Sequence, residues 1–161
     1  MKFDTVQTFR HTPDEVIGAF TSRELYGSCG ATAKLSAPDL VDISGSDTER
    51  IVKVRYRLIA ELPPAALVVV EPAKLSWVEV TTYSLDAMTA SVHFELDHYQ
   101  SKLSATAQTQ FVAQGSGTTR SVAGELRVKI LLGAGAVERV IIGDLVDHLT
   151  EQATQVDTFL D

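Results

Sequence analysis

The sequence predicts an α+β fold in which a seven-stranded antiparallel sheet packs against one long C-terminal helix, with two short helices after the first strand. Three observations predict it. Residues 38–130 follow a polar–apolar period of about two, which is typical of strands. Residues 134–160 place apolar side chains three or four apart, as on one face of a helix. A helix-start signature lies near the N-terminus, at residues 12–15.

The N-terminal segment predicts a strand and then two short helices. Residues 2–9 alternate loosely and indicate a strand. Thr12 is a suitable N-cap, Pro13 suits the first helical position, and Glu15 follows at the spacing of a capping box. Residues 22–29 favour another short helix, which ends among glycines.

The middle of the chain predicts six further strands joined mainly by hairpins. The expected strands span residues 39–44, 49–60, 75–84, 88–96, 102–113 and 118–130. Tight links around Gln100 and at 115–117 favour antiparallel neighbours. The prolines at 63, 64 and 72 exclude a central strand there, so we expect a connection with one helical turn.

Alternation assigns an inward face to most of these strands. The expected inward residues include Val52, Val54, Tyr56 and Leu58, then Ala90, Val92 and Phe94, then Ala105, Ala107 and Phe111, and finally Val122, Leu126 and Val128. The strand at 75–84 is apolar on both sides, and its inward face stays open. Small inward residues such as Ala105 and Ala107 leave volume, which either a ligand or the neighbouring aromatic side chains can fill.

The C-terminal segment predicts a helix about 37 Å long, at 1.5 Å per residue. Its apolar stripe comprises Val137, Ile141, Leu145, Leu149, Ala153, Val156 and Leu160. We expect Leu145 and Leu149 to be buried against the sheet, and Asp144, Asp147 and Glu151 to lie mostly away from the stripe.

Composition excludes several classes of protein. The 161 residues are 45% hydrophobic and 22% charged, with a net charge of −7, which predicts one globular domain over 1–161. An acidic chain without a basic run disfavours nucleic acid and anionic membrane surfaces as partners.

Glu138 and Arg139 interrupt the best apolar stretch, so we expect no integral membrane association. Cys29 is the only cysteine, and the N-terminal segment lacks a signal-peptide pattern, so the expected location is the cytoplasm. The oligomeric state is not predicted.

The glycine turn at 133–135 resembles the start of a dinucleotide site, but its context differs. The third glycine position of that motif falls on Glu138, and only 26 residues follow Gly135, too few for another strand–helix unit. We expect no nucleotide and no other cofactor. Gly133 and Gly135 are expected to give the backbone freedom for a sharp strand-to-helix corner.

The predicted element order, together with two local motifs, resembles the START-like (SRPBCC) superfamily. "FRHTPDEVIGAF" (residues 9–20) is similar to the strand and helix start that open these proteins. "ELRVKILLGAGAVERVI" (residues 125–141) is similar to the last strand and helix start of a bacterial START-like family whose function is not established. The resemblance covers the whole chain and implies a helix-grip fold, a curved sheet wrapped around the long helix. It also implies an apolar cavity for a lipid-like or polyketide-like ligand.

Candidate ligand-binding residues follow from the inward faces together with this resemblance. The expected cavity is lined by Tyr56, Leu58, Trp77, Phe94, Phe111, Leu126, Leu145, His148, Leu149 and Gln152. His148 and Gln152 either orient a ligand or make ordinary hydrogen bonds within a core. Glu138 on the helix and Glu79 on the ambiguous strand are further polar candidates, but they form no convincing ionisable pair.

No catalytic or metal-binding residue is assigned from the sequence. His93, Glu95 and Asp97 share one strand face, yet successive residues on one face lie nearly 7 Å apart. A solvated outer face explains them better than a metal site. The favoured function is therefore a binding or carrier protein for a small hydrophobic ligand. The alternatives are a cyclase- or dehydratase-type enzyme that uses the same cavity, or a protein-interaction module whose cavity has collapsed.

Overall fold

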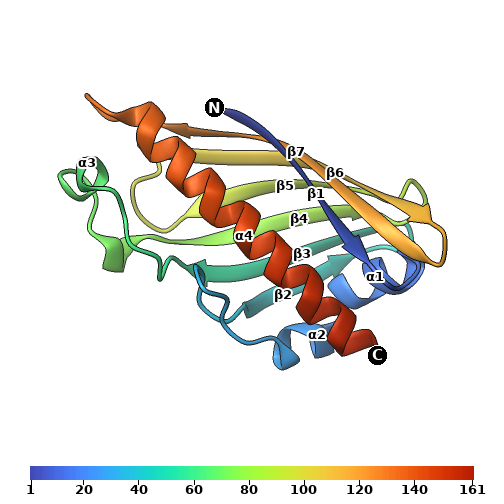
Figure 1. Cartoon of the computed structure of the whole chain (residues 1–161). Coiled ribbons are helices and arrows are strands. Elements are labelled where there is room, and N and C mark those ends of the chain that lie inside the picture. Colours follow the sequence, from blue (N-terminus) through green and yellow to red (C-terminus); the bar gives the residue numbers. More distant parts are fainter.

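The computed structural model describes residues 1–161 and shows one seven-stranded sheet crossed by a long helix (Figure 1). The strands are β1 (Lys2–Phe9), β2 (Asp39–Gly45), β3 (Glu49–Arg57), β4 (Ser76–Ser84), β5 (Thr89–Leu96), β6 (Leu103–Gln114) and β7 (Gly117–Val128). The helices are α1 (Pro13–Phe20), α2 (Arg23–Ser28), α3 (Pro64–Leu67), a 3₁₀ turn (Pro72–Lys74) and α4 (Ala134–Leu160). The strand order is β1-β7-β6-β5-β4-β3-β2, and all neighbours are antiparallel.

The predicted fold class is confirmed, and so is the start of the first helix. Thr12 Oγ1 accepts a hydrogen bond from the backbone N–H of Glu15 at 3.3 Å, and the Glu15 carboxylate accepts one from the Thr12 N–H at 2.9 Å. This reciprocal pair satisfies two N–H groups that the helix itself leaves free. The proline-rich connection also contains the expected single turn of helix, α3.

The sheet register aligns small residues in the middle of the inward face. Val92 on β5 pairs with Ala107 on β6, which pairs with Gly124 on β7, which in turn pairs with Phe3 on β1. A Cβ atom at Gly124 would lie 2.7 Å from Cζ of the Phe3 ring. The Phe3 ring therefore lies over the backbone at Gly124, and a larger residue there would collide with it.

β4 is the strand whose inward face the sequence left open. Its odd-numbered residues point inward, with Trp77 and Tyr83 buried in the main core. Val78 and Val80, on the opposite face, are also buried. Burial on both sides explains why hydrophobicity alone could not orient this strand.

α4 crosses one face of the sheet, and its packing corrects two expectations. Leu145 and Leu149 are half-buried, because they border a cavity instead of packing directly on the strands. Asp144 was expected to lie away from the apolar stripe, but it is 8% exposed. Lys34 Nζ lies 3.2 Å from its carboxylate and compensates the buried charge.

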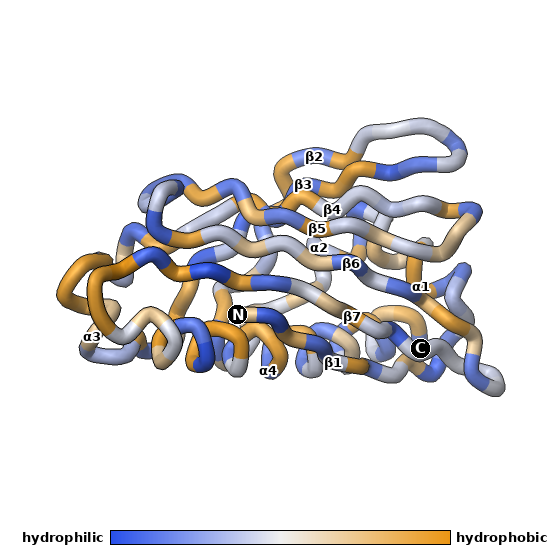
Figure 2. The backbone as a smooth tube through the Cα atoms, turned by 90° about the horizontal axis from the view of Figure 1, so that it is seen from above, coloured by the Kyte–Doolittle hydropathy of each residue, from blue (hydrophilic) through white to orange (hydrophobic).

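The glycine turn makes the corner between β7 and α4. Gly133 has a φ of 80°, a left-handed conformation that side chains with a Cβ disfavour. α3 packs against this corner, and a Cβ at Gly133 would lie 3.2 Å from Cβ of Ala65. Leu131 and Leu132, just before the corner, are 96% and 81% exposed. Figure 2 shows the hydrophobic stretch around α3 at the same end of the molecule.

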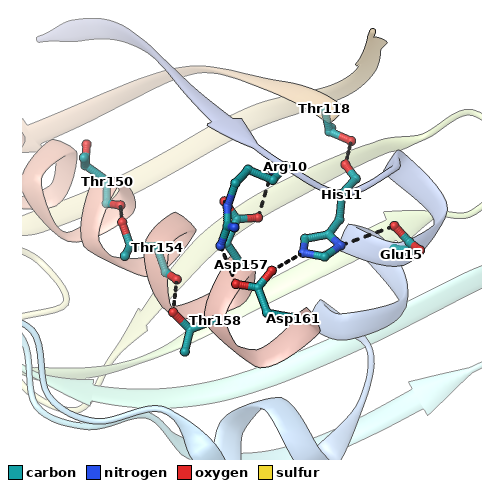
Figure 3. A network of polar contacts seen from close by, with 9 residues as sticks. All are labelled: Arg10, His11, Glu15, Thr118, Thr150, Thr154, Asp157, Thr158 and Asp161. Atoms are coloured by element: carbon teal, nitrogen blue, oxygen red, sulfur yellow. Dashed lines mark hydrogen bonds and ion pairs between the residues drawn. The ribbon is translucent and has the colours of Figure 1, made fainter. Parts of the chain in front are cut away.

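The opposite end of α4 is held by a polar network around the β1–α1 connection (Figure 3). Asp157 accepts a hydrogen bond from the backbone N–H of Arg10 at 3.0 Å. Asp161 contacts the Arg10 guanidinium at 2.5 Å and Nε2 of His11 at 2.9 Å. Thr118 donates to the carbonyl oxygen of His11, which adds β7 to the network. No helix in the structure has the length and hydropathy that a membrane crossing requires.

Candidate functional site

An internal cavity of about 80 Å³ lies between the sheet and α4. Its walls come from strands β1 and β3–β7 and from helices α1, α2 and α4. Of the 21 lining residues 15 are hydrophobic, so the space suits a mostly apolar occupant. The remaining residues are polar or charged, and they determine what chemistry the cavity offers.

The structure brings most of the predicted site residues together at this cavity. Those that line it are Tyr56, Phe94, Phe111, Leu145, His148, Leu149 and Gln152. Leu58, Trp77 and Leu126 instead line a neighbouring void of about 20 Å³. Phe94 and Leu145 border both spaces, so these two side chains separate the cavity from the void.

Arg120, on β7, is the charged residue buried most deeply in the wall. It is 4% exposed, and its Nε donates to Oε1 of Gln7 at 2.9 Å. One terminal nitrogen donates to Oε1 of Gln152 at 2.8 Å, and the other to the Leu149 carbonyl at 3.0 Å. Burial lowers the pKa of Arg120 to about 10, so the guanidinium remains positively charged at neutral pH.

Glu79, on β4, adds a carboxyl group to the same cavity. It pairs across the sheet with Val54 and Phe94, both of which also line the space. Burial raises the pKa of Glu79 to about 7, against the opposing effect of the Arg120 charge. A pKa so close to neutral allows the carboxyl group both to accept and to give a proton.

His148 presents an unpaired ring nitrogen. Its Nδ1 lies 3.1 Å from Oγ1 of Thr32, while its Nε2 is buried without a hydrogen-bond partner. The ring also meets Tyr56 edge to face, with 5.2 Å between centroids. Burial, and to a lesser extent the Arg120 charge, lowers the pKa of His148 to about 4. The imidazole is thus neutral at pH 7, and the hydrogen-bonding capacity of its Nε2 is unused within the protein.

Sequence reasoning missed Arg120 and left Glu79 unassigned. Arg120 has the same parity as the inward residues Val122 and Leu126 on its strand, and this was the available signal. A charged side chain at an inward position is unusual enough to mark a candidate site. Glu79 was hidden because β4 is buried on both faces. Glu138, the other candidate, lies outside the cavity, and its carboxylate accepts from the Val128 N–H at 2.9 Å.

The predicted row of His93, Glu95 and Asp97, on β5 and just after it, makes contacts at the surface. His93 Nε2 lies 3.3 Å from Oε1 of Glu95, and both side chains are exposed. Asp97 accepts from Arg55 and from Ser76 Oγ, the latter at 2.6 Å. No group of three or more His, Cys, Asp or Glu side chains is placed to hold a metal ion.

Comparisons with known proteins identify a family and a fold. The sequence model of a family described as "Protein of unknown function (DUF2505)" matches residues 4–160. No curated protein matches the sequence.

Several solved structures share the architecture at low sequence identity. Protein TTHA0849 from Thermus thermophilus is 11% identical with a TM-score of 0.71, covering 99% of this chain and 97% of that one. The Zhui aromatase/cyclase from a Streptomyces species is 6% identical with a TM-score of 0.67, covering 100% and 96%. Norcoclaurine synthase from Thalictrum flavum is 12% identical with a TM-score of 0.58, covering 99% and 86%. At such identities the likeness shows the fold alone, which is the helix-grip fold of START-like (SRPBCC) proteins, as the sequence predicted.

Proposed function

The chain belongs to the DUF2505 family, and we propose that it binds or carries a small hydrophobic ligand in the cavity between the sheet and α4. One observation carries this proposal: a mostly apolar internal space faces a few polar groups, one of which, Nε2 of His148, has no partner within the protein. Orphaned buried nitrogens are rare in folded proteins. A ligand atom that accepts from or donates to Nε2 would satisfy it.

The size of the cavity limits the ligand. Its volume of about 80 Å³ is below the range of roughly 300–1,000 Å³ that is usual for drug-sized ligands. Rotation of Phe94 and Leu145 would join it to the neighbouring void. We therefore propose a ligand of one or two rings, or a larger one that displaces these two side chains.

Ala107→Phe tests the proposal by filling the cavity. Ala107 lines the space, so a phenyl ring there should exclude the ligand, although overpacking alone typically costs about 1–3 kcal/mol of stability. Native mass spectrometry of the protein purified from cells should show a bound hydrophobic mass in the wild type and none in the variant. Toluene binding, measured by calorimetry, should show a negative heat-capacity change.

Gln108→Phe is the matched control. It adds the same ring at the next position of β6, on the exposed outer face, and should leave binding unchanged. If the wild type retains no ligand and toluene binds neither protein, the binding proposal fails. An interaction module would then explain the fold better.

An enzyme that uses the same cavity is the second candidate, and one arrangement favours it. Three ionisable side chains line the same cavity: Glu79, His148 and Arg120. Acid–base catalysis needs ionisable groups of this kind beside the substrate. Two enzymes, an aromatase/cyclase and norcoclaurine synthase, share the fold. Turnover of a bound compound that is lost in Glu79→Gln, with binding retained, would favour the enzyme over the carrier.

A further inference from the structure

Arg120 is a buried cation without a contacting anion. Its three hydrogen-bond acceptors, on Gln7, Gln152 and Leu149, are all neutral amide or carbonyl oxygens. The rings of Phe9 and Phe20 lie 5.2 and 5.5 Å from the guanidinium carbon and contribute cation–π attraction, but they supply no negative charge. A buried charge without a counterion destabilises the fold. An anion supplied by a bound molecule would reduce this cost at Arg120.

The guanidinium has spare donors, and Arg120 lines the cavity. An arginine side chain offers five N–H groups, and the protein uses three of those on Arg120. The remaining two suit an oxygen that is negatively charged, because charge-assisted hydrogen bonds are about twice as strong as neutral ones. Because Arg120 lines the cavity, a ligand within that space can meet these donors.

Glu79 does not neutralise Arg120 by contact. The two charges share the cavity, yet they form no ion pair, and Glu79 acts on Arg120 only through its field. A second anion beside Glu79 would be repelled, so the favourable place for a negative oxygen is the Arg120 side of the cavity. On that side Phe20, Tyr83 and Phe111 form an aromatic wall, with ring centroids 6.3–6.4 Å apart.

We infer that the ligand is an aromatic molecule with one acidic oxygen, a carboxylate or a phenolate, which binds Arg120 while its ring faces the wall of Phe20, Tyr83 and Phe111. This inference rests on the proposed function, because it assigns a ligand class to the same cavity. It gives Arg120 the role of selecting ligands with a negative oxygen over neutral hydrocarbons.

Benzoate and toluene test the inference, because they have the same ring and differ only in the carboxylate. Titrated at pH 7.5, benzoate should bind the wild type about tenfold tighter than toluene, as expected for one charge-assisted hydrogen-bonding group. Arg120→Met keeps an unbranched apolar stem but removes the guanidinium, and it should abolish this preference while toluene still binds. Arg127→Met removes an equal charge from the exposed face of the same strand and should keep the preference.

Circular dichroism would check that Arg120→Met folds. If Arg120→Met does not fold, the nitrogen-15 NMR spectrum of the wild type tests the inference instead. Benzoate should shift the Nε–H signal of Arg120, and toluene should not. Equal affinity of the two probes, or an equal loss of preference in Arg127→Met, would overturn the inference and leave the proposed function standing. Binding of neither probe at millimolar concentration would instead refute the proposed function itself.

Discussion

Glu79 and His148 line one cavity, and burial shifts their pKa values in opposite directions. The pKa of Glu79 rises from 4.5 to about 7, while that of His148 falls from 6.5 to about 4. The folded protein therefore keeps the Glu79 proton after the unfolded chain has lost it, so this group destabilises the fold as pH rises from 4.5 to 7. Between pH 6.5 and 4, His148 is protonated in the unfolded chain but neutral in the folded protein. This group therefore destabilises the fold as pH falls from 6.5 to 4. In the wild type the two effects oppose each other.

Single substitutions should separate the two pH dependences. Relative to wild type, Glu79→Gln should gain stability as pH rises through 4.5–7, and His148→Gln should gain stability as pH falls through 6.5–4. Each difference should reach about 1–3 kcal/mol, since one pKa unit corresponds to about 1.4 kcal/mol. Urea denaturation at several pH values measures it. Glu95→Gln, at an exposed carboxylate on β5, should show no comparable trend; parallel profiles for all three variants would contradict the assignment.

Alternation along the strands predicted which side chains point inward, but the sequence could not show which charged side chains are buried. Tyr56, Phe94 and Phe111 were predicted at the cavity because their strands alternate cleanly. Arg120 obeys the same alternation, but polarity suggests an outward position for it, and only three-dimensional packing shows the neutral acceptors that keep it inside. Asp144 was misplaced for the same reason, because its partner Lys34 is 110 positions distant in the chain.

Among the elements, α4 depends on how its first turn is entered. Gly133 has a φ of 80°, and a Cβ added there would lie close to Ala65. The corner therefore disfavours a residue with a side chain both by its backbone conformation and by the space it leaves. Nothing crowds Gly135, two residues later and already inside the helix. These two glycines, which the sequence pattern treated alike, therefore have different roles.

Alanine at each glycine should have opposite effects on stability. Gly133→Ala should lower the free energy of unfolding by about 1–2 kcal/mol, the cost of a left-handed conformation for a residue with a Cβ. Gly135→Ala should be neutral or stabilise by up to about 1 kcal/mol, because alanine favours helix over glycine. Thermal denaturation of both variants measures the difference. Equal losses at both positions would mean that the corner does not need its left-handed residue.

Element types were predictable from the sequence because periodicity and capping are local properties. The period of two predicted β5, β6 and β7, and the stripe of apolar residues predicted α4. The cavity was harder to predict, since its volume depends on where α4 lies above the sheet. That placement left Leu145 and Leu149 half-buried at a void, although their spacing alone predicts a closed helix–sheet contact.

Over the whole molecule, the chain is closed by contacts between its two ends. The polar network of Figure 3 holds the last turn of α4 against the β1–α1 connection. Asp157 is the buried carboxylate of this network, and it accepts a hydrogen bond from the Arg10 backbone. The closure at this end of the molecule therefore depends on Arg10 and Asp157, which lie 147 positions apart in the chain.

Asp157→Ala should loosen this closure. It removes the charged acceptor of the partly buried Arg10 N–H, which should cost about 1.5–3 kcal/mol, the usual net contribution of a hydrogen bond to a charged group. Hydrogen exchange at the Arg10 amide should become faster along with the loss of stability. Asp147→Ala removes a carboxylate from the middle of the same helix, away from this network, and should leave both measurements unchanged. Unaltered exchange at Arg10 in Asp157→Ala would show that the contact does not hold the helix end.

The position of Trp77 has an optical consequence. It is the only tryptophan of the chain, its ring stacks on Phe94 with 5.1 Å between centroids, and its buried indole N–H has no hydrogen-bond partner. Phe94 itself borders the cavity, so a molecule that enters there contacts the ring on which the indole rests. Indole emission responds to the polarity and packing around it, and no second tryptophan obscures the signal. Unlabelled compounds can therefore be screened for entry into the cavity by the fluorescence of one native residue.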